Sequence, residues 1–271
     1  MKIEKIVIGA KFGSAEAEVA ARDVANTFLQ RGCRVYVLSP ISVNGAIPLE
    51  AIEDLGDAGL DLAITLGGDG TTLRTLRHLS DETPILTINV GGNRGILSEI
   101  TLEQLPQAIS QMESDNIILE KRIRVVASYN GEEFPPALNE IYITRSNLTR
   151  TANMMIKFQN DTVTQKMDGV MISTPSGSTG HSFSLGGPIL HESLDVLIIT
   201  PVAPMYRLAS IVVPDDIIEI IPSHDCSIVM DAQVIKYAEF NETITIKKHD
   251  KRAVFVRLKK RGLRQMSKMG F

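Results

Sequence analysis

Two glycine-rich segments in the first third of the chain carry residue types that bind phosphate. The first, Gly67-Gly68-Asp69-Gly70, follows the apolar run DLAITL, and the second, residues 89–100 (NVGGNRGILSEI), follows PILTINV. Glycine lets the backbone approach an anion closely, and the N–H groups that open a following helix attract negative charge. A carboxylate beside a bare phosphate is repelled, so Asp69 must accept a proton or share a cation there. Alone, the first segment fits equally a tight turn with an aspartate N-cap, whereas two such loops side by side favour the floor of a cleft.

A longer segment rich in hydroxyl groups, residues 168–190, offers a second place for a polar ligand. Its sequence DGVMISTPSGSTGHSFSLGGPIL combines glycines with Ser173, Thr174, Ser176, Ser178, Thr179, Ser182 and Ser184. A flexible linker has a similar composition, but an apolar strand-like run precedes the segment and others follow it, which favours an ordered loop. The GxSxG spacing of a serine hydrolase is missing, and so are the HExxH, Walker A and EF-hand patterns.

Asn139 and Glu140 stand directly before the strand-like run IYIT. Neighbouring amide and carboxylate groups suit the hydrogen bonds of a nucleobase or a ribose. They also suit a turn that starts a strand, so this pair decides nothing by itself.

The elements that must position the glycine loops alternate between strand and helix. Strands are expected at KIVIGA, RVYVLS, DLAITL and PILTINV. One helix is expected between Ser14 and the terminating Gly32, and another over residues 71–79. A third opens at the capping box Thr101-Leu102-Glu103-Gln104 and runs to about Met112. This alternation predicts a Rossmann-like α/β domain with a parallel sheet over residues 1–114.

The pattern changes after Asp115. The run IILEKRIRVVASYN alternates with a two-residue period, and Asn130-Gly131 is a strong hairpin signal. Further strands are expected at EIYITR, MMIKFQ, GVMIST, DVLIIT, IIEIIP, SIVMD, TITIKK and AVFVRL. We therefore predict a β-rich, sandwich-like domain over residues 115–249. Periodicity does not decide whether residues 250–271 stay with it or return to the first domain.

The composition is ordinary for a soluble globular protein: 271 residues, 44% hydrophobic and 22% charged, with a net charge of -4. The acidic balance argues against a general nucleic-acid or membrane-surface binder. The apolar run near the N-terminus is too short for a signal peptide or a membrane span. Only Cys33 and Cys226 are present, which fits a reducing compartment and disfavours a cysteine metal site. We expect a cytoplasmic protein with small-molecule partners and neither nucleic-acid nor membrane partners.

The order of these motifs resembles that of the NAD kinase family, of the prokaryotic or archaeal type. The match extends from about Asp61 to Gln233. GGDG is shared with phosphofructokinases and with diacylglycerol and sphingosine kinases, whereas the long Ser/Thr/Gly element is specific. The resemblance implies an α/β N-terminal domain, a β-rich C-terminal domain and an active site between them. It also implies phosphoryl transfer from ATP or polyphosphate to the adenosine 2′-hydroxyl of NAD, a divalent cation such as Mg²⁺, and a homodimer or homotetramer.

The same resemblance assigns roles on the phosphate side of the reaction. Asp69 matches the family's catalytic aspartate, which accepts or orients the proton of the 2′-hydroxyl. Gly68, Gly70 and Thr71 are then expected to face the donor phosphates. No protein metal ligand is assigned, because Mg²⁺ is often held mainly by substrate phosphates and water.

On the NAD side, Asn139 and Glu140 match the family's Asn-Glu pair, and Asp168 matches the aspartate at the nicotinamide ribose and carboxamide. The other residues assigned to the NAD site are Ser178, Thr179, Gly180, His181, Ser184 and Gln233.

The sequence departs from the family pattern in places. Gly180-His181 replaces the common Ala-Tyr, so either His181 stacks where the tyrosine lies or the pocket is altered. Gly95-Ile96-Leu97 replaces Gly-Phe-Leu, and Asp231-Ala232-Gln233 replaces Asp-Gly-Gln. The segment PMYRLASIVVPDD lacks a histidine that the family often has there.

Two other functions stay open: a dinucleotide-binding protein without kinase activity, and a GGDG-superfamily kinase with another acceptor. Retention of Asp69, Asn139 and Glu140 argues against the first, and the long Ser/Thr/Gly element argues against the second. A Rossmann dehydrogenase is disfavoured, because GAKFGS after the first strand lacks the GxGxxG spacing.

Overall fold

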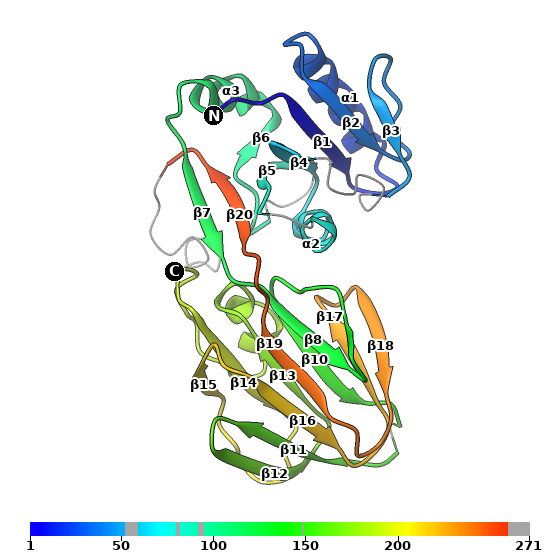
Figure 1. The fold of residues 1–271 in the computed structure, drawn as a ribbon, viewed down its shortest axis with the longest axis vertical. Helices are drawn as coiled ribbons and strands as arrows, with labels where there is room; N and C mark the ends of the chain where they lie inside the picture. Colours follow the sequence, from blue (N-terminus) through cyan, green and yellow to red (C-terminus); the bar gives the residue numbers. More distant parts are fainter. Residues whose placement is uncertain (52–58, 80–81, 92–94, 148, 260–271) are drawn as a thin grey trace. The chain divides into compact units, whose positions relative to one another are not determined.

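The computed structural model describes residues 1–51, 59–79, 82–91, 95–147 and 149–259. They form two compact units (Figure 1). Unit 1 comprises residues 1–121 together with the strand β20 (Ala253–Arg257), and unit 2 comprises residues 122–252. The chain therefore leaves unit 1, builds unit 2 and returns to unit 1 for β20.

Unit 1 is built on an eight-stranded sheet with the strand order β3-β2-β1-β4-β5-β20-β7, in which β6 also pairs with β5. The bounds are β1 (Lys5–Ala10), β2 (Arg34–Leu38), β3 (Ile47–Leu49), β4 (Leu62–Leu66), β5 (Pro84–Asn89), β6 (Ile100–Thr101) and β7 (Ile118–Arg122). The neighbours from β3 to β20, and the pair β5–β6, run parallel. The expected parallel, Rossmann-like sheet is confirmed.

Helices α1 (Ala15–Leu29), α2 (Asp69–His78) and α3 (Leu105–Glu113) connect these strands. Ser14 caps α1, and the expected capping box is present at the short 3-10 helix η2 (Leu102–Gln104) that leads into α3. The apolar faces of α1 and α3 pack in one core with alternate residues of the strands, including Ile6 and Ile8. The connections β1–β2 and β4–β5 run in opposite directions along the sheet. Since such crossovers are almost always right-handed, α2 is expected on the face opposite to α1. The strand order therefore reverses between β1 and β4, and GGDG follows β4 at that point.

Unit 2 contains two six-stranded sheets, with the orders β15-β14-β13-β10-β17-β18 and β12-β11-β16-β19-β8-β9. All their strand pairs are antiparallel. The first sheet comprises β10 (Glu140–Arg145), β13 (Gly169–Ser173), β14 (Val196–Val202), β15 (Ile211–Pro214), β17 (Cys226–Met230) and β18 (Val234–Ala238). The second comprises β8 (Val125–Tyr129), β9 (Glu132–Glu133), β11 (Ala152–Phe158), β12 (Asp161–Met167), β16 (Ile218–Pro222) and β19 (Ile244–Lys248).

One hydrophobic core joins the two sheets of unit 2. It takes alternate residues of each strand, such as Ile141 and Ile143 from β10 and Ile244 and Ile246 from β19. The other residues of these strands face outward, which is the period-two pattern read from the sequence. The expected β-rich, sandwich-like domain is confirmed.

The strands that the sequence did not predict are β3, β6, β9, β12, β15 and β18. All except β6 lie at an edge of their sheet, and β6 has only two residues. An edge strand has one unpaired side and less buried surface, so its hydrophobic pattern is weak. Among the residues that the structure describes, every helix is too short or too polar to traverse a lipid bilayer.

Candidate active site

Asp69 is the first residue of α2, where the chain leaves β4. Its carboxylate accepts two hydrogen bonds from the loop after β5: from the backbone N–H of Ile96 at 2.8 Å and from that of Leu97 at 2.9 Å. The two glycine-rich segments therefore meet at this half-buried carboxylate. Two backbone donors fix its orientation while each oxygen keeps a second lone pair.

Gly95 is required by this close approach. A Cβ at residue 95 would overlap the carboxylate of Asp69. Any side chain there would displace the carboxylate from the N–H groups of Ile96 and Leu97. The glycine of this loop thus serves the aspartate of the other loop.

The remaining residues expected on the phosphate side lie at the start of the same helix. Gly68 is the N-cap residue of α2, and Gly70 is exposed in its first turn. Thr71 is buried, and its N–H donates to the carbonyl of Gly68 at 3.1 Å. The first N–H groups of a helix carry partial positive charge, so this end of α2 suits an anion.

In unit 2, the start of β10 is held by a carboxylate from another turn. Asp231, between β17 and β18, accepts hydrogen bonds from the backbone N–H groups of Leu138 at 2.9 Å and Asn139 at 2.8 Å. It also accepts one from the N–H of Glu140 at 3.2 Å. In the sequence, Asp231 was noted only because Asp231-Ala232-Gln233 resembles a family motif. In the structure its carboxylate anchors the backbone at the start of β10.

The Ser/Thr/Gly segment holds Asn139 from the other side. Thr174 donates its hydroxyl to the carbonyl of Leu138 at 2.5 Å and its N–H to the carbonyl of Asn139 at 2.8 Å. Gly177 lies in the 3-10 helix η3 (Pro175–Thr179), and a Cβ there would overlap the Asn139 backbone. Two distant stretches of sequence, the turn with Asp231 and the Ser/Thr/Gly segment, thus converge on the Asn-Glu pair.

Part of the hydroxyl-rich segment is engaged within the fold. Ser178 is fully buried, donates to the carbonyl of Pro175 at 2.7 Å and accepts from the N–H of Leu190 at 3.0 Å. Ser182, also fully buried, shares a hydrogen bond of 3.0 Å with the hydroxyl of Thr200. These bonds make the segment an ordered element, not a flexible linker.

Other assigned residues of this segment reach the surface. Thr179 is half-buried, whereas Gly180, His181 and Ser184 are exposed around the short helix α4 (His181–Ser184). The His181 ring meets the edge of the Tyr142 ring at 5.7 Å between centroids and 74° between planes. Tyr142 lies on β10 two residues after Glu140, so both side chains belong to the same face of the strand.

Glu140 is a buried carboxyl, only 7% exposed. Burial, and next the negative charge of Asp231, raise the pKa of Glu140 to about 7. Its cross-strand partner Ser173 is fully buried, and the Ser173 hydroxyl has no hydrogen-bond partner within the described ranges. A carboxyl and a hydroxyl that lie together in this way can be satisfied by the polar groups of a ligand.

Asp168 and Gln233 complete the assigned set. Asp168, just before β13, forms an ion pair of 2.7 Å between its Oδ1 and the Nε of Arg145. Gln233 is exposed, and its N–H donates to the carbonyl of Met230 at 2.9 Å in the turn that carries Asp231. Sequence reasoning missed Arg145 and Tyr142, although alternation along EIYITR places Tyr142 on the outward face with Glu140.

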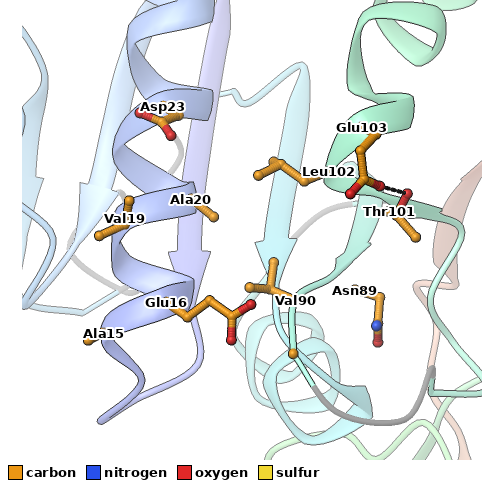
Figure 2. Close-up of a pocket in the computed structure, with 11 residues that line it drawn as sticks. Ala15, Glu16, Val19, Ala20, Asp23, Asn89, Val90, Thr101, Leu102 and Glu103 are labelled. Carbon is orange, nitrogen blue, oxygen red and sulfur yellow. Dashed lines mark hydrogen bonds between the residues drawn. The ribbon is translucent and has the colours of Figure 1, made fainter.

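A separate cavity of about 560 Å³ lies between α1 and the turn that opens α3 (Figure 2). The carboxylates of Glu16, Asp23 and Glu103 line it beside apolar residues such as Val19 and Leu102. None of the residues assigned above is among its lining. Among the described lining residues, the charged side chains are these three carboxylates, which disfavours a polyphosphate in this cavity.

Within the part of the chain that the structure describes, no group of three or more His, Cys, Asp and Glu side chains could hold a metal ion. The Asp69 carboxylate is a hard oxygen donor of the kind that Mg²⁺ takes in ones and twos beside substrate phosphates.

Comparison with known proteins gives matches along most of the chain. Residues 6–117 match the family model described as the ATP-NAD kinase N-terminal domain, and residues 138–258 match the ATP-NAD kinase C-terminal domain. The chain is 31% identical to an NAD kinase of Methanothermobacter thermautotrophicus over 94% of this chain and 92% of that protein. It is 32% identical to NAD kinase 1 of Synechocystis over 76% of this chain and 71% of that protein.

Solved structures agree with these matches. The structure of an NAD kinase from Archaeoglobus fulgidus in complex with ATP superposes with a TM-score of 0.76 and 27% identity, over 98% of this chain and 97% of that chain. Yeast NADH kinase complexed with NADH superposes with a TM-score of 0.87 over 99% of this chain and 88% of that chain, and at 18% identity shows the shared fold.

Proposed function

This chain belongs to the NAD kinase family, and we propose that it phosphorylates the 2′-hydroxyl of the adenosine ribose of NAD, giving NADP, with ATP as the donor. The observation that carries the mechanism is the Asp69 carboxylate, held by two backbone N–H groups at the start of α2. Phosphoryl transfer needs positioning and charge neutralisation more than covalent catalysis, and both are available here.

Asp69 acts on the proton of the attacking hydroxyl. The N–H groups of Ile96 and Leu97 hold the carboxylate in one orientation, and the second lone pair of each oxygen can accept the 2′-hydroxyl proton. The donor phosphates lie against Gly68, Gly70 and the start of α2, where helix N–H groups favour negative charge. Thr71 supports this end of α2, because it is buried and its N–H donates to the carbonyl of Gly68.

The NAD groups bind on the outward side of β10 in unit 2. Asn139 and Glu140 contact the nucleoside, and the buried Glu140 carboxyl and Ser173 hydroxyl gain a ligand partner. Asp168 contacts the nicotinamide ribose and carboxamide while Arg145 holds its Oδ1. The exposed residues that complete the pocket are Thr179, Gly180, His181, Ser184 and Gln233. Ser178 supports this pocket from beneath through its bonds to Pro175 and Leu190.

The divalent cation that we expect is Mg²⁺. The donor phosphates and water would hold it, and the Asp69 carboxylate is the hard oxygen ligand that the chain would offer beside them. When bound, it neutralises charge on the phosphate oxygens. The chain acts in the cytoplasm as a homodimer or homotetramer. Support for self-association comes from the exposed Ile235 and Tyr237 on the edge strand β18, since such side chains favour a contact surface.

The test is an assay of purified protein with NAD, Mg²⁺ and either ATP or polyphosphate, in which NADP is measured. We expect NADP with ATP, and its absence with every donor while NAD still binds would establish a dinucleotide-binding protein without kinase activity. Product from another acceptor alone would establish a different kinase of the GGDG superfamily. Omission of Mg²⁺ and titration with chelator test the cation.

A further inference from the structure

Arg257 is a buried cation whose position in the fold connects it to the proposed catalytic loop. It is the last residue of β20, and its side chain is 1% exposed. One guanidinium nitrogen donates to the carbonyl of Leu97 at 3.2 Å and to the carboxylate of Glu99 at 3.3 Å. The other donors reach Glu120, and the guanidinium lies over the Phe255 ring at 4.6 Å from its centroid.

The carbonyl and the N–H of Leu97 point to different partners. The N–H is one of the two donors that hold Asp69, and the carbonyl accepts from Arg257. The same carbonyl also accepts from the hydroxyl of Thr87 at 2.7 Å, and this hydroxyl accepts from the N–H of Glu99 at 2.9 Å. The loop that carries the N–H donors to Asp69 is thus held at the Leu97 carbonyl by two side chains, the charged guanidinium of Arg257 and the neutral hydroxyl of Thr87.

The residue type at position 257 matters for this geometry. A guanidinium is a planar fork with five N–H donors, so it can serve a carbonyl and two carboxylates at once. Glu99 is 2% exposed and also accepts from the N–H of Leu258 at 2.9 Å, so it is bound both to Arg257 and to the residue that follows it. A lysine keeps the charge beside Glu99 and Glu120, but its single nitrogen cannot reproduce the fork.

We propose that Arg257 is a positioning residue for Asp69, acting through the backbone of Leu97, whose carbonyl it binds and whose N–H binds Asp69. The role rests on the proposed function, because it assumes that Asp69 handles the hydroxyl proton. Arg257 contacts neither the reacting atoms nor the phosphates in this scheme. By fixing the carbonyl of Leu97, it restrains the backbone on one side of the Leu97 Cα and so limits the movement of the N–H on the other side, which orients the carboxylate. A displacement of about 1 Å at a catalytic group can cost about 100-fold in rate.

The first experiment is a double-mutant cycle on kcat with NAD, ATP and Mg²⁺. Arg257→Lys is expected to lower kcat by about 10- to 100-fold and to leave the KM for NAD within about twofold. In an Asp69→Asn background the same change is expected to alter the residual kcat by less than about threefold, because the group it positions is gone. Losses that simply add would overturn the proposal, since they would indicate general damage to the fold.

Glu120→Gln is the matched control. It perturbs the same ion-pair cluster without a contact to Leu97, so this variant should keep the wild-type kcat.

A second pair of variants alters the other hydrogen bond to the Leu97 carbonyl and leaves every charge in place. This pair keeps the proposal testable if Arg257→Lys does not fold. Thr87→Val removes the hydroxyl that donates to Leu97, and Thr87→Ser keeps it. We expect Thr87→Val to lower kcat by about tenfold and Thr87→Ser to restore it. Equal kcat in both variants would overturn the proposal.

Amide hydrogen exchange separates this inference from the function itself. In Arg257→Lys the N–H groups of Ile96 and Leu97 should exchange at least about tenfold faster, whereas those of α1 should not change. If the wild-type chain makes no NADP, the proposed function fails, and the exchange result still decides whether Arg257 holds this loop. Unchanged exchange at both amides would overturn the inference.

Discussion

Asp69 in unit 1 and Asp231 in unit 2 are both aspartates that accept backbone N–H groups from a distant segment, yet their surroundings differ. Asp69 is half-buried and takes two N–H groups, from Ile96 and Leu97. Asp231 is 4% exposed and takes three, from Leu138, Asn139 and Glu140. In the first case the backbone positions the carboxylate, and in the second the carboxylate positions the backbone.

The same kind of contact, a carboxylate bound by backbone N–H groups, thus supports two different tasks. A carboxylate bound by amides keeps spare lone pairs, and accessibility decides whether a substrate can use them. The half-buried Asp69 can meet a hydroxyl proton, whereas Asp231 holds the backbone of the Asn-Glu pair and adds negative charge beside Glu140. Four sets of experiments test this distinction.

The largest effect is expected from exchanging each aspartate for asparagine. Asp69→Asn should lower kcat by about 100- to 10,000-fold with NAD affinity nearly unchanged, because the amide cannot accept a proton. Asp231→Asn keeps one oxygen for three N–H groups, so it should lower the free energy of unfolding by about 2 kcal/mol and weaken NAD binding, with a smaller loss of kcat. Steady-state kinetics and NAD titration measure both. A kcat loss in Asp231→Asn as large as that in Asp69→Asn would remove the distinction.

The next effect concerns the pH dependence of stability. Glu140 has a folded pKa of about 7 against an ordinary value of 4.5, so between these pH values the folded chain retains a proton that the unfolded chain has lost. The free energy of unfolding should therefore fall as pH rises from about 4.5 to 7, by about 3 kcal/mol at about 1.4 kcal/mol per pH unit, and then level off.

Urea unfolding of the wild type and Glu140→Gln at pH 5 and pH 8 isolates this contribution. The variant should lack that part of the pH dependence, because glutamine does not ionise in this range. Identical pH dependence in both proteins would show that Glu140 ionises normally.

Smaller effects on kcat and on NAD affinity are expected from substituting two glycines, one beside Asp69 and one beside Asn139. Gly95→Ala introduces a Cβ that overlaps the Asp69 carboxylate, and Gly177→Ala introduces one that overlaps the Asn139 backbone. We expect the first to lower kcat by about 10- to 100-fold and the second to raise the dissociation constant of NAD by about tenfold. Both should cost about 1–3 kcal/mol of stability. Kinetics and calorimetric titration separate the two, and the reverse assignment would contradict the roles given to the two loops.

The smallest effect is expected at Ala232, which follows Asp231 and has a φ of 54°. A left-handed backbone costs an alanine about 1–2 kcal/mol, whereas glycine adopts it freely but loses more entropy on folding. Ala232→Gly should therefore raise the free energy of unfolding by about 0.5 kcal/mol net. Thermal unfolding measures this, with Ala238→Gly in the adjacent strand as the control that should destabilise. A lower Tm for Ala232→Gly would show that its conformation carries no strain.

Much of the fold could be predicted because a strand that is buried on both faces has a continuous apolar run, and one that is buried on a single face alternates between apolar and polar residues. KIVIGA, DLAITL and PILTINV are central strands of a parallel sheet, and their apolar runs are continuous. EIYITR and TITIKK alternate because one face packs in the sandwich core. Edge strands such as β12, with the sequence DTVTQKM, have little to bury and no such period.

The sequence predicts those parts of the candidate site that consist of characteristic side chains, but not the parts that consist of backbone groups. Asp69 and Glu140 were singled out by their motifs, whereas the clamp on Asp69 consists of backbone N–H groups, which any residue supplies. Composition also cannot separate Ser178, whose hydroxyl holds the loop, from Ser184, which is exposed. That difference depends on tertiary packing.

The return of β20 to unit 1 has a consequence for biosynthesis. This strand lies between β5 and β7, yet the ribosome makes it after every residue of unit 2. Unit 2 is continuous and can fold as soon as it emerges, whereas the sheet of unit 1 stays open between β5 and β7 until β20 inserts. Since Arg257 lies on that strand, the loop that orients Asp69 is secured late. The loop that orients Asp69 therefore takes its final form only after β20 has been made.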